Sequence, residues 1–572
     1  MSNKANEHIR ENSLLAKQML RLNICYFATS NKNKKLVKAL FYSFLTAVVL
    51  FSTVNCARKG RPNGGPKDTL SPIMVTAYPP YESINFNEKK IKLQFDEYVK
   101  FKNLNKQLII SPPLKNTPEI TPIGTASKTV LIKITDTLKP NTTYSINFGN
   151  SIVDNNEGNQ LGAFKYVFST GSYVDSLQIE GRVKDAFEKE TSDNIAVLLY
   201  EINESYTDSI IYKEAPTYLA NTLDSILFDI SNIKAGKYQL LALKDKNSNN
   251  RFDPYDDKIG FLNEPITIPT DTNFVLSLFK ETPKLMIKRP IEKKVGKVIF
   301  GYKGEVEGLD IELLTPTPEG FQSIIQKEKE KDTLNYWFTP FDVDSLQFKL
   351  SKGTWKEEHT VMLRTGKKDS LSLKAGIKNT LDPRDTFYIE SNLPMLTLDP
   401  SKIIVTDKDT LEVPFKAILD ASKTKLSFEF DRTRNNAYQF DLLPNAVKGM
   451  FGEINDTLQY KIKTRDIETY GILELQFKND KKRNILIDLL EEKGELVTQK
   501  AIDKSEKIVY NDLNPTSYYL RIIVDKNKNN HWDTGDFLNK IQPEKTHYYP
   551  LEMKLKANWT INEVIDIDAI SF

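Results

Sequence analysis

The sequence predicts an all-β protein made of several β-sandwiches in series. Apolar and polar residues alternate in many short segments, among them 90–95, 130–134 and 144–148. A period of two residues is typical of a strand with one buried face. Turn residues recur at short intervals between these segments, as in sandwiches with many short strands. Helical periodicity is scarce, so we expect few helices.

The composition limits the classes of structure and function. The 572 residues are enough for several domains, and 27% charged with 40% hydrophobic residues is ordinary for globular proteins. A net charge of +3 is small for this length, so the charge gives no case for nucleic-acid binding. The only cysteines are Cys25 and Cys56. Thiolate zinc sites are therefore excluded, and core packing or bound metal must hold the domains together.

A basic segment, an apolar run and a cysteine follow one another between Lys32 and Cys56. The run Ala39–Val54 carries no charge and is shorter than the roughly 20 residues that cross a bilayer as a helix. This order indicates a secretory signal peptide. We therefore assign residues 1–55 to an upstream segment and a signal peptide; a later start at Met19 would account for the polar residues 1–31.

The cysteine at the end of this run resembles that of a bacterial lipoprotein signal. The resemblance implies cleavage before Cys56 and attachment of lipid to its sulfur. Thr53 and Asn55 depart from the usual pattern, so an ordinary signal peptide or an uncleaved anchor is the alternative. Residues 56–70 show no hydrophobic pattern, which favours a flexible tether between the lipidated cysteine and the folded part.

Five domains are predicted after the tether, at 71–171, 175–278, 283–370, 371–468 and 469–572. The first contains Gln94–Val99, Leu138–Tyr144 and the Asn/Gly-rich Asp154–Asn159. These segments resemble the bacterial Ig-like domain of surface-layer type, found at the start of many outer-membrane lipoproteins of the Bacteroidota. The resemblance implies an Ig-like sandwich for 71–171.

The second domain contains an internal repeat unit. The strand Ile195–Tyr200 and the turn and strand Ile233–Leu240 resemble a transthyretin- or Cna-B-type sandwich, and both recur at Asn484–Leu490 and Leu513–Leu520. Residues 175–278 and 469–572 are thus predicted to be two copies of one domain. Residues 371–468 look like a degenerate copy of the Ig-like domain, and 283–370 form a β-sandwich spacer without a recognisable motif.

An acidic loop of the same design follows each transthyretin-like copy. Oxygen-bearing side chains at loop positions 1, 3, 5, 9 and 12, with a backbone carbonyl at position 7, match the register of an EF-hand calcium loop. Position 12 is Asp instead of the bidentate Glu, so we expect weak, structural Ca²⁺ binding, with Kd of about 10⁻⁴ to 10⁻³ M. The alternative is a hairpin held by side-chain-to-backbone hydrogen bonds. The expected ligands are Asp245, Asn247, Asn249, Arg251, Asp253 and Asp256, and Asp525, Asn527, Asn529, His531, Asp533 and Asp536.

The pattern Asp-Ser/Thr-Leu/Ile occurs ten times and resembles the O-glycosylation acceptor of periplasmic Bacteroidota proteins. The alternative is structural, because Asp ends turns and β-prone residues begin strands. The candidate O-glycosylation residues are Thr69, Thr137, Ser176, Ser209, Ser225, Thr333, Ser345, Ser370, Thr410 and Thr457.

No catalytic motif is recognisable, and we expect a protein that is not an enzyme. The sequence has no Gly-x-Ser-x-Gly elbow, P-loop or dinucleotide fingerprint. His359, His531 and His547 lack a second histidine at the spacing of a zinc protease. The two distant carboxylates of a glycosidase would leave no such signature.

We therefore expect a lipid-anchored outer-membrane protein that is an accessory or scaffold subunit of an envelope complex for barrel assembly, secretion or transport. Its partners would be the outer membrane, through the lipid anchor, and other envelope proteins. The alternative is a surface lipoprotein that binds a glycan or peptide. Exposed aromatic residues near Trp337 and Trp355 would then stack on sugar, although such residues are more often part of a core. Basic residues after the cysteine favour the periplasmic face, but the surface face stays open: Arg58, Lys59 and Arg61.

Overall fold

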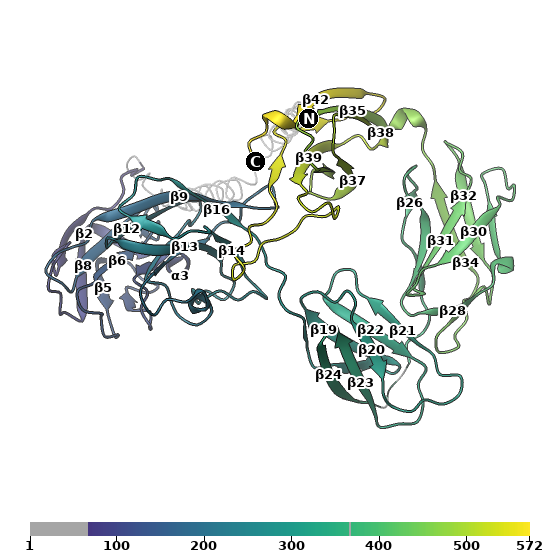
Figure 1. Cartoon of the computed structure of the whole chain (residues 1–572), viewed down its shortest axis with the longest axis horizontal. Coiled ribbons are helices and arrows are strands. Elements are labelled where there is room, and N and C mark those ends of the chain that lie inside the picture. Colours follow the sequence, from purple (N-terminus) through teal and green to yellow (C-terminus); the bar gives the residue numbers. More distant parts are fainter. Residues whose placement is uncertain (1–66, 365, 367) are drawn as a thin grey trace, which may run out of the picture. The chain divides into compact units, whose positions relative to one another are not determined.

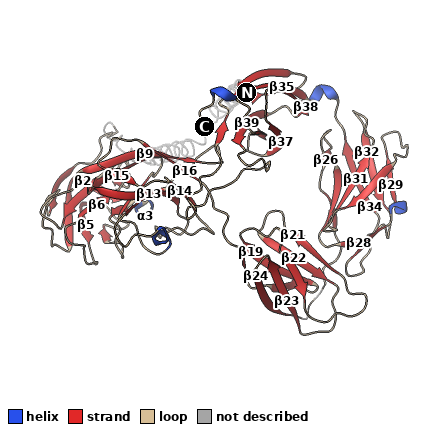
Figure 2. Cartoon of the chain, in the orientation of Figure 1, coloured by secondary structure: helices blue, strands red, loops and turns tan. Residues whose placement is uncertain are grey.

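A computed structural model describes residues 67–364, 366 and 368–572. The predicted signal peptide, Cys56 and most of the tether lie outside the described residues. Strands make up nearly all of the secondary structure (Figure 2), which confirms the all-β fold class. Leu70–Phe572 form one compact unit, in which the strands are labelled in Figure 1. Below, modules 1 to 5 denote residues 71–171, 175–278, 283–370, 371–468 and 469–572.

Module 1 consists of two sheets packed face to face. Ile91, Leu93 and Phe95 alternate inward from β2 and are at most 1% exposed, as the period of two predicts. The sheets run β1 (Met74–Tyr78), β2 (Lys90–Phe101), β5 (Ser127–Lys133), β4 (Glu119–Thr121), with β7 (Ile152–Asp154) also on β2; and β3 (Ile109–Ser111), β6 (Thr143–Asn147), β8 (Lys165–Ser169). The helix α3 (Leu104–Gln107) precedes β3.

Modules 2 and 5 have the same strand order. In both, the last strand pairs in parallel with the first, β16 with β9 and β42 with β35. Module 2 has β12 (Leu227–Ile233), β9 (Leu177–Asp185), β16 (Phe274–Leu278); and β11 (Tyr218–Asn221), β10 (Ala196–Glu201), β13 (Gly236–Lys244), β14 (Lys258–Phe261), with β15 (Ile266–Ile268) on β13. Module 5 has β38 (Glu506–Leu513), β35 (Gly471–Lys478), β42 (Thr560–Asp566); and β37 (Leu496–Ile502), β36 (Ile485–Glu491), β39 (Ser517–Val524), β40 (Thr546–Tyr548), with β41 (Met553–Lys554) on β39.

Module 3 also has two sheets, which enclose its own core. They are β17 (Met286–Ile287), β19 (Lys297–Lys303), β22 (Thr333–Phe338), β21 (Ser323–Lys327), with β18 (Ile291–Lys294) on β19; and β20 (Asp310–Leu313), β23 (Ser345–Lys352), β24 (Trp355–Met362). Trp337 is 1% exposed, and Trp355 packs half-buried against this core. Trp337 is therefore a packing residue and does not offer a face to a sugar, which corrects its assignment as a stacking residue.

Module 4 shares a local arrangement with module 1. The Tyr144 hydroxyl accepts a hydrogen bond from Lys139 N (2.8 Å), and the Tyr438 hydroxyl accepts one from Thr433 N (2.7 Å). In both, the tyrosine holds the turn five residues before it. The sheets of module 4 are β25 (Leu373–Ala375), β27 (Phe387–Ser391), β31 (Lys425–Phe430), β30 (Phe415–Leu419); β26 (Asn379–Thr380), β34 (Leu458–Lys463), β32 (Ala437–Leu442), β29 (Ile403–Thr406); and β28 (Met395–Leu398), β33 (Val447–Gly449). Short 3₁₀ turns are η1 (Asp208–Tyr212), η2 (Pro400–Lys402), η3 (Ile467–Thr469) and η4 (Ile567–Ala569).

Modules 2 and 5 differ at one buried pair on the sheet face directed away from the core between the sheets. Leu198 lies opposite Leu241 in module 2, whereas Asp488 lies opposite Arg521 in module 5. Arg521 donates to Asp488 from Nε (2.9 Å) and Nη2 (2.7 Å), and both side chains are at least nine-tenths buried. Module 5 therefore holds a desolvated ion pair at the place where module 2 holds two leucines.

We expect that replacing either partner alone, Asp488→Leu or Arg521→Leu, lowers the free energy of unfolding by about 3–5 kcal/mol, because one buried charge loses its counter-ion. The double variant should recover most of this loss, because module 2 already packs two leucines at this place. Hydrogen exchange of the β36 and β39 amides measures the effect. A double variant as unstable as the single ones would contradict this explanation.

Candidate functional site in the acidic loops

The first carboxylate of each acidic loop fixes the loop backbone. Asp245 follows β13 and accepts a hydrogen bond from Asn250 N (2.6 Å), and Asp525 follows β39 and accepts one from Asn530 N (3.1 Å). Both asparagines have left-handed backbones, with φ of 56° and 64°, which Asn tolerates better than most residues. The two loops therefore share their first half.

A second shared carboxylate was missed by the sequence prediction. Asp257 accepts hydrogen bonds from Lys246 N and Asp253 N, both at 2.9 Å. Glu544 makes the same two contacts in module 5, with Lys526 N (2.7 Å) and Asp533 N (3.2 Å). These carboxylates lie 11 and 18 residues beyond the lysine that each contacts. No fixed spacing signals them, but each is the last acidic residue before the next strand of its sheet.

The two aspartates at position 12, which the sequence analysis names as ligands, make other contacts in the described structure. Asp256 forms an ion pair with Lys303 of module 3 at 2.8 Å. This hydrogen bond with Lys303 lowers the pKa of Asp256. Asp536 accepts hydrogen bonds from Asn539 N (2.8 Å) and Nδ2 (2.9 Å). Their assignment as Ca²⁺ ligands stays a prediction, and each would have to give up these contacts to bind an ion.

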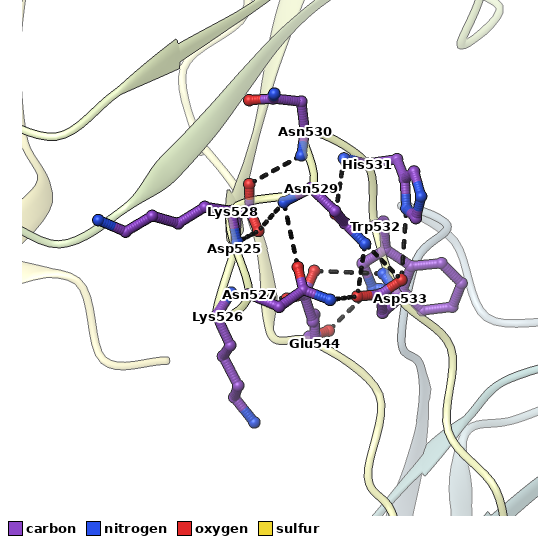
Figure 3. Close-up of polar contacts among 10 residues, drawn as sticks. All are labelled: Asp525, Lys526, Asn527, Lys528, Asn529, Asn530, His531, Trp532, Asp533 and Glu544. Atoms are coloured by element: carbon purple, nitrogen blue, oxygen red, sulfur yellow. Dashed lines mark hydrogen bonds and ion pairs between the residues drawn. The ribbon is translucent and has the colours of Figure 1, made fainter.

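The middle positions of the second loop are arranged around Asp533 (Figure 3). Asn527 and Asn529 both donate their side-chain amides to this carboxylate, and His531 Nδ1 lies 3.3 Å from it. In the first loop, Asn249 Oδ1 accepts from Arg251 N (2.8 Å), and the Asn247 N–H donates to Asp245. Hydrogen bonds from side chain to backbone thus hold both loops, as the hairpin alternative predicts.

The recurring carboxylates repel one another. Burial raises the pKa of Glu544, and the nearby Asp533 and Asp525 raise it further, against hydrogen bonds from Lys526 N and Asp533 N that lower it. Burial raises the pKa of Asp257 in the same way, with Asp245 and Asp253 as its charged neighbours. Within 67–364, 366 and 368–572, no group of three or more His, Cys, Asp or Glu side chains is arranged to hold a metal ion.

The segment after the second acidic loop packs into module 2. Phe537 is fully buried among aromatic residues of that module, with its ring centroid 5.2 Å from that of Phe261. Phe537 N donates to Glu281 Oε1 (2.6 Å), and Lys540 pairs with Asp208 at 2.7 Å. This segment therefore completes a hydrophobic cluster of a module some 250 residues earlier in the chain.

Module 2 contributes a reciprocal contact to module 5. The centroid of the Phe187 ring lies 4.6 Å from that of Trp532, and the guanidinium carbon of Arg521 lies 3.7 Å from the same Phe187 centroid. The Tyr548 hydroxyl donates to Phe187 O at 3.0 Å. The second acidic loop, which carries Trp532, therefore lies beside both contacts between modules 2 and 5, that of Phe537 and that of Phe187.

The remaining predicted sites lie mostly at the surface. Eight of the ten candidate O-glycosylation residues are exposed, and Thr333 and Ser345 are half-buried. His359 contacts Glu357 at 3.1 Å, and burial together with Lys184 lowers the pKa of His547. No helix in the described part of the chain is long and apolar enough to span a bilayer.

Comparison with known proteins identifies the first module. Residues 68–170 match the bacterial Ig-like domain family Big_5. Residues 68–170 are thus similar to a bacterial Ig-like domain, as the sequence analysis expects for module 1. No curated protein matches this chain.

Among solved structures, the S-layer protein rSbsC(31-844) is similar at 10% identity over 85% of this chain and 68% of that one, with a TM-score of 0.16. The Bacillus anthracis TIE protein is similar at 12% identity over 88% of this chain and 76% of that one, with a TM-score of 0.14. Scores this low carry no argument about arrangement or function.

We expect Phe537→Ala to open the contact between modules 2 and 5, at a cost of about 3–5 kcal/mol, because a fully buried aromatic ring is removed. Amides of β14 near Phe261 should exchange faster with solvent. Leu538→Ala is the matched control, because Leu538 is exposed. Equal exchange in both variants would show that Phe537 does not hold the modules together.

The raised pKa of the Glu544 carboxyl predicts that the free energy of unfolding depends on pH. Because its folded pKa lies above its ordinary value of 4.5, the folded state binds more protons between these two values, and this group's contribution to stability falls as the pH rises through them. We expect Glu544→Gln to gain stability relative to the natural chain between pH 4 and pH 7, measured by urea unfolding at both pH values. A difference that stays constant or reverses would contradict this sign.

Proposed function

We propose that this chain is a non-catalytic, lipid-anchored protein of the outer membrane, of the Bacteroidota lipoprotein type, that serves as a scaffold or accessory subunit of an envelope complex. A barrel-assembly, secretion or transport complex is the expected partner. The contact between modules 2 and 5 carries this proposal, because it ties distant parts of the chain into one unit, as a scaffold requires. The bacterial Ig-like domain in module 1 supports an extracytoplasmic role.

The anchor and the partner are tested separately. Growth with an alkyne-labelled fatty acid should label the natural chain and leave Cys56→Ser unlabelled; a labelled Cys56→Ser chain would overturn the anchor. Affinity purification of the tagged full-length protein from outer membranes in mild detergent, with mass spectrometry, should recover a stoichiometric envelope protein. Recovery of the chain alone would contradict the scaffold role and favour the alternative, a surface lipoprotein that binds a glycan or peptide.

We further propose weak, structural Ca²⁺ binding by the two acidic loops. Its carboxylate ligands would be Asp245, Asp253 and Asp257, and Asp525, Asp533 and Glu544, which would have to move together, because the described residues hold no ready-made metal-binding group. Burial, and after it the charges of neighbouring aspartates, raise the pKa of Glu544 and Asp257. A divalent cation would offset the cost of both, which favours this proposal. Binding would require Asn527 and Asn529 to turn their amide oxygens toward the ion, because Ca²⁺ takes six or more oxygen ligands.

Millimolar Ca²⁺ should change the emission of Trp532, and a chelator should reverse the change. The emission change is assigned to Trp532 by its loss in the Trp532→Phe variant. Glu544→Gln should abolish the response, whereas Asp536→Asn should keep it, because Asp536 points to Asn539. Loss of the response in Asp536→Asn alone would restore the EF-hand register, and no response in the natural chain would leave the loops as hydrogen-bonded hairpins.

A further inference from the structure

Module 1 exposes apolar side chains around the start of its first strand. Leu70, Ile73 and Val75 are each more than half exposed. Val75 lies where the register between β1 and β2 shifts, and β1 is an edge strand that pairs with β2. Apolar side chains gathered on the surface of a soluble domain mark an interaction site.

Contacts across the sheet bring two further exposed residues to the same end. Ile73 N donates to Asp96 Oδ1 (2.8 Å), and Tyr98 follows on β2. Lys128 Nζ donates to Asp96 O (2.6 Å) and lies 5.7 Å from the centroid of the Tyr98 ring. Ile123, which is 81% exposed, belongs to the turn between β4 and β5, shortly before Lys128. Below, the apolar rim denotes Ile73, Val75, Tyr98 and Ile123.

The chain enters module 1 at this rim. Cys56 and Leu70 are fourteen positions apart in the sequence, and a fully extended chain of that length spans at most about 50 Å. The sheet itself is long, because the 12 residues of β2 rise over about 40 Å. A lipid on Cys56 would therefore keep module 1 close to the bilayer, with the rim as the end of the sheet nearest to the attachment.

The chemistry of the rim suits the boundary between lipid headgroups and acyl chains. Ile73, Val75 and Ile123 supply aliphatic surface, whose removal from water favours insertion. Tyr98 combines an apolar ring with a hydroxyl, and such side chains are enriched at this depth of a membrane. Lys128 can direct its ammonium to lipid phosphate groups while its aliphatic stem lies along the apolar surface.

We propose that the apolar rim of module 1 inserts into the headgroup region of the membrane that holds the lipid anchor. The chain then contacts the bilayer at two points, the acyl chains on Cys56 and the rim. The second contact determines which end of module 1 faces the lipid. This inference rests on the proposed lipid anchor, but it does not depend on the scaffold role or on Ca²⁺.

Tryptophan quenching in vesicles tests the insertion. The lipid-bearing full-length chain is placed in phosphatidylcholine vesicles with or without brominated acyl chains, which quench a tryptophan that reaches them. Ile123→Trp puts a reporter in the rim. Ile84→Trp is the matched control, because Ile84 is exposed and lies beyond the carboxyl end of β1. After subtraction of the emission of the natural chain, we expect loss of emission in brominated vesicles for Ile123→Trp and none for Ile84→Trp.

Variants at Val75 separate insertion from mere closeness to the surface. In the Ile123→Trp background, Val75→Asp should remove the quenching, because a carboxylate opposes transfer of the rim out of water. Val75→Ile should keep it. Val75→Trp is a second reporter, which should be quenched like Ile123→Trp and serves if that variant does not fold.

Flotation of the same vesicles shows whether the chain is attached to them. A natural chain that does not float would overturn the lipid anchor and this inference with it. A chain that floats without quenching at position 123 would leave the anchor standing and overturn insertion of the rim. Equal quenching at positions 84 and 123 would also overturn it, because module 1 would then have no preferred end. Loss of a co-purified envelope protein on Ile123→Asp, without quenching, would assign the rim to a protein partner instead.

Discussion

The need to cover both faces of two central sheets determines how this chain is organised. In β10, residues Ala196–Tyr200 are all buried, and in β36, Ile485–Leu490 are all buried. One face of each strand packs against the opposite sheet of its own sandwich. The other face needs a separate cover, because apolar side chains left in water would cost much of the stability of a domain. Modules 2 and 5 obtain part of that cover from each other.

The residues that cover the outer sheet face differ in chemistry between modules 2 and 5, although the two modules have the same strand order. Phe537 inserts into an aromatic cluster on module 2, whereas Phe187 lies against Arg521 and Trp532 on module 5. The two acidic loops also differ in the parts of the chain that they lie beside. Residues of the first loop line a cavity beside module 1, and the second leads into the segment that carries Phe537. Two sandwiches with the same strand order thus present different surfaces.

Local patterns in the sequence were sufficient to predict the fold class and many strands, because inward and outward residues alternate along a strand whatever surrounds it. The first half of β2, for example, follows from the alternation of Ile91, Leu93 and Phe95, whereas its continuation to Phe101 does not. The acidic loops show where this reasoning ends. Asp245 and Asp525 were recognised by linear spacing, but Glu544 reaches the same cluster across a long excursion of the chain. Trp337 was offered as a surface residue because sequence alone does not show that β22 is covered.

The burial of Phe537 within module 2 also imposes an order on how the protein can be completed. A ribosome makes the chain from its amino terminus, so the strands of module 2 emerge long before the residue that closes their aromatic cluster. Until about 250 further residues have been made, Phe261 and Phe279 stay partly uncovered on a sheet that is otherwise formed. The aromatic cluster of module 2 is therefore completed late in synthesis, when Phe537 of module 5 packs into it.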